Sequence, residues 1–182
     1  MEKIPTCEIT GLQQALNAAW GALEVPARAL VEECTRYGFD PYTDPEDVPM
    51  FRAGLVGKRF DEVEVWSGAF YIVGLLYELP PHLASYYLGS YLHYVLRVLG
   101  TEGFFDDDWL VLNGEMPTIH LIKQLGRLDE ELARELSSRQ IAVVRDFIKL
   151  VLRLGPEFYY DEPTRAGLGR AVEFIDARLA GA

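Results

Sequence analysis

The architecture follows from one segment, residues 80–99, which reads P-P-H-L-A-S-Y-Y-L-G-S-Y-L-H-Y-V-L-R-V-L. Two prolines open it, and proline suits the first turn of a helix, where its missing N–H would have had no partner. Behind them, apolar residues recur at spacings of three and four, as in a helix buried over a wide face. The pattern predicts a central helix at about residues 81–99, wrapped by other helices. Five residues are expected on its narrow polar stripe: His82, Tyr86, Gly89, His93 and Arg97.

The size and composition of the chain fit one globular domain. It has 182 residues, 49% of them hydrophobic and 25% charged, enough for a core without disulfides or metal staples. No repeat or linker composition divides it, so residues 1–182 are expected to form a single all-α domain. Cys7 and Cys34 match no metal or redox spacing and no signal peptide is recognised, so we expect a cytoplasmic protein.

The charge balance restricts the class of partner. The sequence contains 17 basic and 28 acidic residues, a formal net charge of −11. This charge repels phosphates at long range, which opposes binding to nucleic acid or anionic membranes and favours a basic protein partner. Solubility alone also explains the acidity and is the simpler interpretation. Residues 79–96 carry no formal charge, but their polar groups share one face, which indicates a buried helix and not a membrane span.

Two helices are expected before residue 38. Thr10 is placed to cap the first, which Gly21 interrupts. The second is expected over residues 26–37, because Pro26 opens it and Gly38 suits its end. The residues expected to face inward are Leu12, Leu16, Ala19 and Trp20 or Leu23 in the first helix, and Leu30, Val31 and Cys34 in the second.

The next part of the chain gives mixed signals. Residues 39–49, F-D-P-Y-T-D-P-E-D-V-P, predict an extended acidic loop. Residues 51–66 fit either of two structures: alternation around Val63 favours a short strand, and Asp61 is placed to cap a helical turn. We favour the helix. A further helix is expected from residue 67 to residue 77.

The C-terminal part predicts four helices. Short helices are expected over residues 119–125 and 129–136. Ser137 and Gln140 form a capping box, S-x-x-Q, for a long helix over residues 138–154. The last helix is expected to start at Asp161 or Glu162, before Pro163. The exposed stripe of the long helix should carry Arg145, Lys149 and Arg153, and the apolar stripe of the last helix Leu168, Val172, Ile175 and Leu179.

Three sequence stretches together carry a resemblance. They are G-K-R-F-D-E-V at 57–63, L-P-P-H-L-A-S-Y-Y-L-G-S-Y-L at 79–92 and L-S-S-R-Q-I-A-V-V-R-D-F-I at 136–148. They resemble a bacterial all-helical domain family of uncharacterised function, whose central helix is of the Y-Y-L-P-A-Y-L type and precedes an L-[ST]-x-x-Q capped helix. Here Gly89-Ser90 stands where that pattern has Pro-Ala. The resemblance implies an all-helical fold and a bacterial cytoplasmic origin, and it implies no catalytic residues.

No residue pattern indicates catalysis, a cofactor or a metal site. His82 and His93 are eleven residues apart, about 16 Å along a helix, too far to share a metal ion. His120 has no carboxylate at helical spacing. Asp106–Asp108 lack the glycine and glutamate of a calcium-binding loop. Ser90 lies three residues before His93, but a serine within a helix lacks the oxyanion donors of acyl transfer. We therefore expect no enzyme, no cofactor and no metal.

Two acidic loops are the candidate binding surface. The first mixes aromatic and acidic residues, the composition of an interface with buried anchors and a charged rim. The alternative is that its aromatic residues enter the core while its aspartates are solvated. Residues 40–47 form the second acidic candidate. The predicted partner-binding residues are Glu102, Phe105, Asp106, Asp107, Asp108 and Trp109 in the first loop, and Asp44, Glu46 and Asp47 in the second.

These features predict an acidic cytoplasmic binding protein. Its most concrete form is an immunity protein that neutralises a secreted bacterial toxin by docking on the toxin's basic surface or active-site cleft, because complementary charge gives fast association. One alternative is a small helical enzyme or ligand-binding domain with a pocket near His93, lined also by Tyr86 and Ser90. Another is a self-associating scaffold protein, which a large apolar surface patch would indicate.

Overall fold

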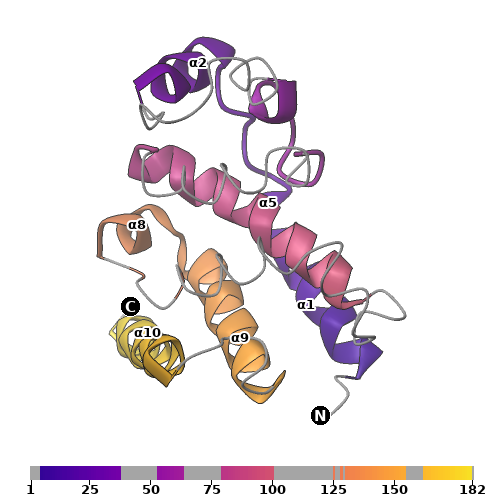
Figure 1. The fold of residues 1–182 in the computed structure, drawn as a ribbon, viewed down its shortest axis with the longest axis vertical. Coiled ribbons are helices and arrows are strands. Elements are labelled where there is room, and N and C mark those ends of the chain that lie inside the picture. Colours follow the sequence, from indigo (N-terminus) through magenta and orange to yellow (C-terminus); the bar gives the residue numbers. More distant parts are fainter. Residues whose placement is uncertain are drawn as a thin grey trace.

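The computed structural model describes residues 5–37, 53–63, 79–100, 125, 128, 130–154 and 162–181. Within these ranges the chain contains no strand and its helices pack against one another, which confirms the predicted all-α class. The helices labelled in Figure 1 are α1 (Thr6–Trp20), α2 (Arg28–Tyr37), α5 (Pro81–Leu99), α8 (Glu130–Glu135), α9 (Ser138–Leu154) and α10 (Glu162–Ala180).

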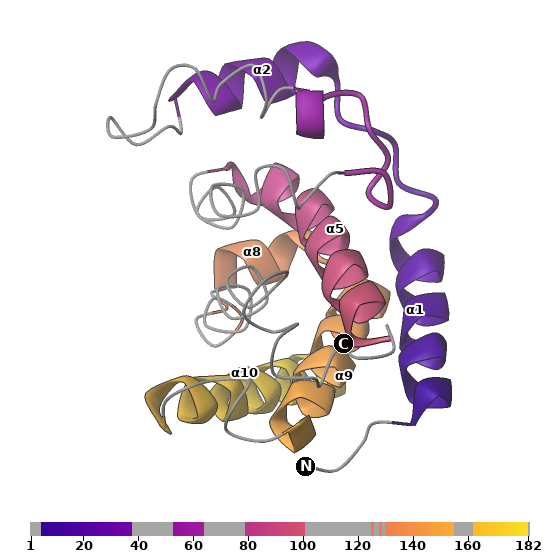
Figure 2. The same ribbon diagram turned by 45° about the vertical axis from the view of Figure 1, so that its right-hand side comes forward.

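Helix α5 lies in the middle of the arrangement. α1 and α8 pack against it, and α9 packs against both α1 and α10 (Figure 1, Figure 2). Residues 83–92 of α5 are all buried. The predicted central helix is therefore confirmed with the expected bounds. The predicted polar stripe is only partly right: His82, His93 and Arg97 are at least partly accessible, whereas Tyr86 and Gly89 are buried.

Gly89 is buried because α1 approaches α5 at this position. A Cβ atom built on Gly89 would overlap the side chain of Trp20, so the missing side chain makes room for the indole. The indole Nε1 donates a hydrogen bond of 3.0 Å to the carbonyl oxygen of Ser85, one turn earlier in α5. Shape and hydrogen bonding thus fix α1 against the central helix at the same place.

Helix α1 begins at Thr6, one turn before the cap predicted at Thr10. Pro5 occupies the N-cap position, and the N–H of Glu8 donates to its carbonyl oxygen over 2.9 Å. The prediction at Thr10 was wrong because it relied on a polar cap, whereas the added turn is stabilised by burial of Ile9. Thr10 is an exposed residue within the helix.

Helix α2 begins at Arg28, two residues after the predicted start. Val31 is fully buried, as expected. Leu30 was expected to face inward but is 38% exposed, because neighbouring residues of a helix point about 100° apart and only one of them faces the core. Leu23, the alternative to Trp20 as an inward-facing residue, lies beyond the end of α1 and is 41% exposed.

Residues 53–63 are not one continuous helix. A single helical turn at 53–55 is followed by turns up to residue 62, with Gly57 at a φ of +71°, which glycine adopts without strain. Two phenol groups of α5 hold this segment: Tyr87 donates to the Leu55 carbonyl oxygen over 3.3 Å, and Tyr86 donates to the Lys58 carbonyl oxygen over 3.1 Å. These contacts explain why Tyr86 is buried.

The predicted capping box at the start of α9 is confirmed. The Ser137 N–H donates to Gln140 Oε1 over 2.9 Å, and the Gln140 N–H donates to Ser137 Oγ over 3.3 Å. α9 runs from Ser138 to Leu154 as predicted, and α8 lies within a residue of its predicted bounds. α10 begins at Glu162, one of the two starts predicted for the last helix. Local sequence was sufficient here, because both partners of the cap lie within four residues.

Charged residues of α9 join three helices. Arg145 and Lys149 form ion pairs with Asp176 of α10, at 3.4 and 3.1 Å. Arg153 pairs with Glu8 of α1. The predicted outer stripe of α9 is thus partly exposed, and it also connects this helix to its two neighbours.

The helices expected at 67–77 and 119–125 lie outside the described residues, apart from Leu125, which is helical and buried. Among the helices described, none has the length and apolar character needed to cross a membrane.

We predict that Gly89→Ala lowers the free energy of unfolding by about 1–3 kcal/mol, because the added methyl group must displace the Trp20 ring. Gly169→Ala is the matched control in α10, since a Cβ atom there meets nothing within 4 Å, and it should stabilise by up to about 1 kcal/mol. Urea unfolding followed by circular dichroism measures both. Stabilisation by Gly89→Ala would contradict the packing described.

We predict that Ser137→Ala lowers the free energy of unfolding by about 1 kcal/mol, because it removes the hydroxyl that caps α9. Ser138→Ala is the control: this exposed neighbour makes no side-chain hydrogen bond among the described residues, and its substitution should change stability by less than about 0.5 kcal/mol. The same denaturation measurement applies. Equal losses in the two variants would show that the cap does not stabilise the helix.

Candidate functional site

The predicted partner-binding residues lie outside the described part of the chain. They fall within residues 38–52 and 101–124, so their role stays a prediction. The residues concerned are Asp44, Glu46, Asp47, Glu102, Phe105, Asp106, Asp107, Asp108 and Trp109.

The described helices and turns have no excess of either charge. Of the 28 acidic and 17 basic residues, 13 of each fall in the described ranges. The other 15 acidic and 4 basic residues account for the whole net charge of −11. Residues 38–52 and 101–124 together carry nine of those acids and two of those bases. Most of the net negative charge of the sequence therefore falls in the two stretches that contain the candidate binding residues.

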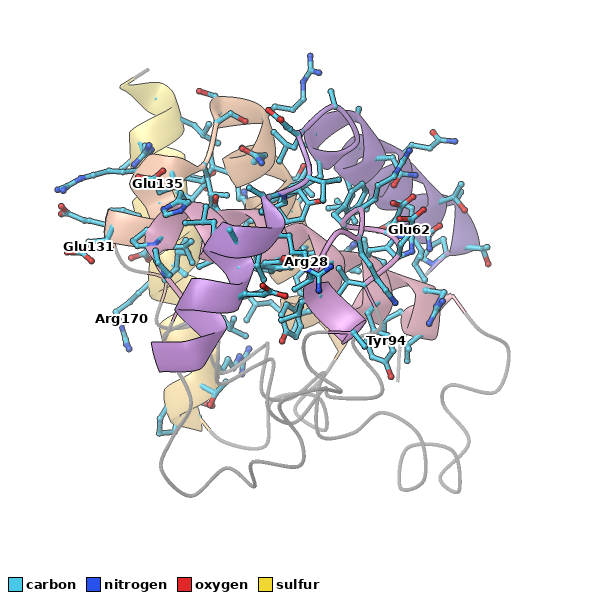
Figure 3. The ribbon with its side chains drawn as sticks, turned by 90° about the horizontal axis from the view of Figure 1, so that it is seen from above. Arg28, Glu62, Tyr94, Glu131, Glu135 and Arg170 are labelled. Atoms are coloured by element: carbon cyan, nitrogen blue, oxygen red, sulfur yellow. The ribbon has the colours of Figure 1, made fainter. Side chains whose placement is uncertain are left out.

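Many charges of the described elements are already paired. Besides the ion pairs of α9, Arg28 pairs with Glu32 at 2.9 Å and Arg134 with Glu130 at 2.7 Å, each one turn apart. Glu131 and Glu135 lie on α8 at one side of the molecule, and Glu62 lies on the opposite side (Figure 3). These three acidic residues thus lie on two different sides of the molecule (Figure 3).

A groove of about 370 Å³ lies between α1 and α9. Small and apolar residues contribute much of its lining, and four charged residues complete it. Each of these four makes an ion pair, with another lining residue or with a residue of α9 or α10. The pKa of Glu8 is lowered by the hydrogen bond from Arg153. The groove therefore offers mainly an apolar surface. Its lining residues are Gly11, Leu12, Ala15 and Leu150, with Glu8, Asp146, Lys149 and Arg153.

The centre of α5 contains three buried polar atoms without a hydrogen-bond partner: Ser90 Oγ, Tyr91 Oη and His93 Nδ1. Buried polar groups are nearly always paired, so three within four residues are unusual. Ser90 and Tyr91 are at most 1% exposed. The Phe60 ring meets the His93 ring edge-on, with 5.9 Å between centroids. These atoms form the strongest candidate for a site within the described residues.

The protonation states in this region follow from burial. Desolvation lowers the pKa of His93, and Arg97 one turn later lowers it further, while Asp61 opposes them. Burial raises the pKa of Tyr86, Tyr87 and Tyr91. The imidazole and the phenols are therefore neutral near pH 7.

Within the described ranges, no three histidine, cysteine or acidic side chains are grouped in a way that could hold a metal ion. Cys7 is exposed and His82 is exposed. His120 lies outside the described residues.

Sequence reasoning identified His93 and Ser90 as pocket candidates and placed His93 on the polar stripe of the helix, where its side chain is partly accessible although Nδ1 is buried. The unpaired state of Tyr91 was missed, because its apolar position in the helical pattern gives no sign of where its hydroxyl ends. The groove between α1 and α9 was also missed: Glu8 and Arg153 are 145 positions apart, and no local pattern connects them.

No family model, curated protein or solved structure matches the chain. The resemblance to a bacterial all-helical domain family stays a prediction.

We predict that His93 makes the protein less stable as the pH falls below about 6.5. The folded state disfavours the charged imidazole, so the unfolded state binds the proton more readily, and stability is lost as the pH drops from the unfolded to the folded pKa. His93→Gln should reduce this pH dependence, measured as the urea midpoint between about pH 7.5 and 5.5. The control His82→Gln makes the same substitution at an exposed histidine of the same helix, so the comparison isolates the effect of the partly buried ring. An unchanged slope in His93→Gln would contradict the prediction.

Proposed function

We propose that this chain is a binding protein that docks a basic protein partner through its two acidic loops, residues 44–47 and 102–109. The observation that carries the proposal is the distribution of charge along the sequence: residues 38–52 and 101–124 together contain nine acidic and two basic residues, which is −7 of the net charge of −11. A general need for solubility does not require such segregation, because acidic residues on the helices would serve it equally well.

The most concrete form of the proposal is an immunity protein for a secreted bacterial toxin. A toxin that acts on nucleic acid or nucleotides has a basic cleft, and three consecutive aspartates at 106–108 would mimic the phosphates it binds. Complementary charge raises association rates by about 10- to 1000-fold. Phe105 and Trp109 flank the aspartates in sequence and would supply the buried anchors that slow dissociation.

The test uses the purified product of the reading frame directly upstream as the probe. We predict that the variant D106K/D107K/D108K binds it at least about 10-fold more slowly than the wild type at low salt, and that added salt reduces the difference. Surface plasmon resonance measures the association rate. Co-expression in a bacterial host measures protection: the wild type should relieve growth arrest by the upstream product, and the variant should fail to do so.

The control reverses three acidic residues of the described part: E24K/E135K/E173K. These side chains are exposed and form no ion pair with other described residues. Each triple variant moves the net charge from −11 to −5, so the two differ only in where the charge changes. The control should keep its association rate within about threefold. Equal losses in both variants would contradict docking through the loop, and an upstream product that neither arrests growth nor binds would contradict an immunity function.

A further inference from the structure

The unpaired atoms Ser90 Oγ and His93 Nδ1 lie on the same side of α5. Residues three apart are neighbours on a helix surface, with Cβ atoms about 5–6 Å apart. Both atoms are buried, and they do not bond to each other. One oxygen atom placed within hydrogen-bond distance of both can bridge atoms up to about 6 Å apart. The spacing of this pair therefore suits a single bridging oxygen.

Tyr91 Oη belongs to a different place. It follows Ser90 by one residue and points about 100° around the helix from it. A ligand that bridges Ser90 and His93 would not reach Tyr91 in the same way. Tyr91 is thus a matched control: it is equally buried and equally unpaired, and it lies outside the pair.

The surroundings of the pair are held in place. Phe60 meets the His93 ring edge-on, and Tyr86 and Tyr87 join the preceding turn of α5 to residues 55 and 58 by hydrogen bonds. The local contacts that position His93 and Ser90 are therefore made without using either polar atom. Buried polar atoms in folded proteins are nearly always hydrogen-bonded, either to the protein or to an ordered group between them, so this pair of unpaired atoms points to a bridging group.

We propose that Ser90 and His93 hold the hydroxyl group of a small neutral ligand, which donates a hydrogen bond to His93 Nδ1 and accepts a second one from the Ser90 hydroxyl. This assigns a binding site at the centre of α5, and the inference does not rest on the proposed docking function.

The charges around the site favour a neutral ligand. Arg97 lies one turn beyond His93 on the same side and disfavours a cation, whereas Asp61, on the facing segment, disfavours an anion. Burial disfavours an ion of either sign. A hydroxyl group satisfies both unpaired atoms without adding charge, because it can donate one hydrogen bond and accept others. Two sources provide this chemistry: an ordered water molecule, or the alcohol group of a small organic compound.

The first experiment asks whether the site is occupied, and by which source. Native mass spectrometry is applied to the protein as purified and to the same protein refolded from urea in plain buffer, where water is the only hydroxyl donor. A mass excess in the purified protein that S90A removes, and that Y91F keeps, identifies an organic alcohol and supports the proposal. Where no mass excess is found, a cross-peak from a long-lived water to the His93 ring or Ser90 in nuclear Overhauser spectra supports the water form.

The second experiment reads the hydrogen bond itself. The nitrogen-15 resonance of His93 Nδ1 should shift in S90A relative to the wild type and should not shift in Y91F. S90A replaces serine by a good helix former and is expected to fold. Three results would overturn the proposal: neither a mass excess nor a water cross-peak, an unchanged Nδ1 resonance in S90A, or the same shift in S90A and Y91F.

Discussion

The packing of Trp20 against Gly89 is the constraint on which the rest of this structure depends. Residues 83–92 of α5 are buried on every side, and the large Trp20 indole of α1 needs room among them. Gly89 provides that room, and the Ser85 carbonyl oxygen accepts a hydrogen bond from the indole that enters. α1 is held there, α9 packs on α1, and α10 packs on α9. A larger side chain at residue 89 would therefore disturb the position of α1 and, through α1, the packing of α9 and α10.

Local sequence patterns predicted the helices correctly where the residues that determine them lie close together in the chain. The period of apolar residues identified α5, and the Ser137–Gln140 cap located the start of α9, since these signals act within one or two helical turns. Sequence patterns did not predict the burial of a residue or the start of a helix where these depend on a residue far away in the chain. Gly89 and Tyr86 have polar-stripe positions in the pattern, but Trp20 and Lys58 bury them. Pro5 in place of Thr10 as the cap of α1 reflects the burial of Ile9, which depends on the tertiary core.

The candidate functional residues divide in the same way. The acidic loops were identified from composition alone, and their residues lie outside the described ranges, so the docking surface rests on the charge distribution of the whole chain. Ser90 and His93 were noted from their spacing, but only the structure shows that neither atom has a partner. A sequence contains the donors and acceptors of a helix. Which of them remain unused is a property of the packed fold.

The ultraviolet absorbance of the tyrosines of α5 can report whether this helix is packed in the core. Burial raises the pKa of Tyr86, Tyr87, Tyr91 and Tyr94, four of the ten tyrosines in the chain. Ionised phenols absorb at longer ultraviolet wavelengths than neutral ones. In moderately alkaline solution these four phenols should stay neutral, and should not contribute to the phenolate absorbance, while the helices remain packed. The absorbance they gain on heating or in denaturant would therefore report the opening of the central helix itself, with no label attached.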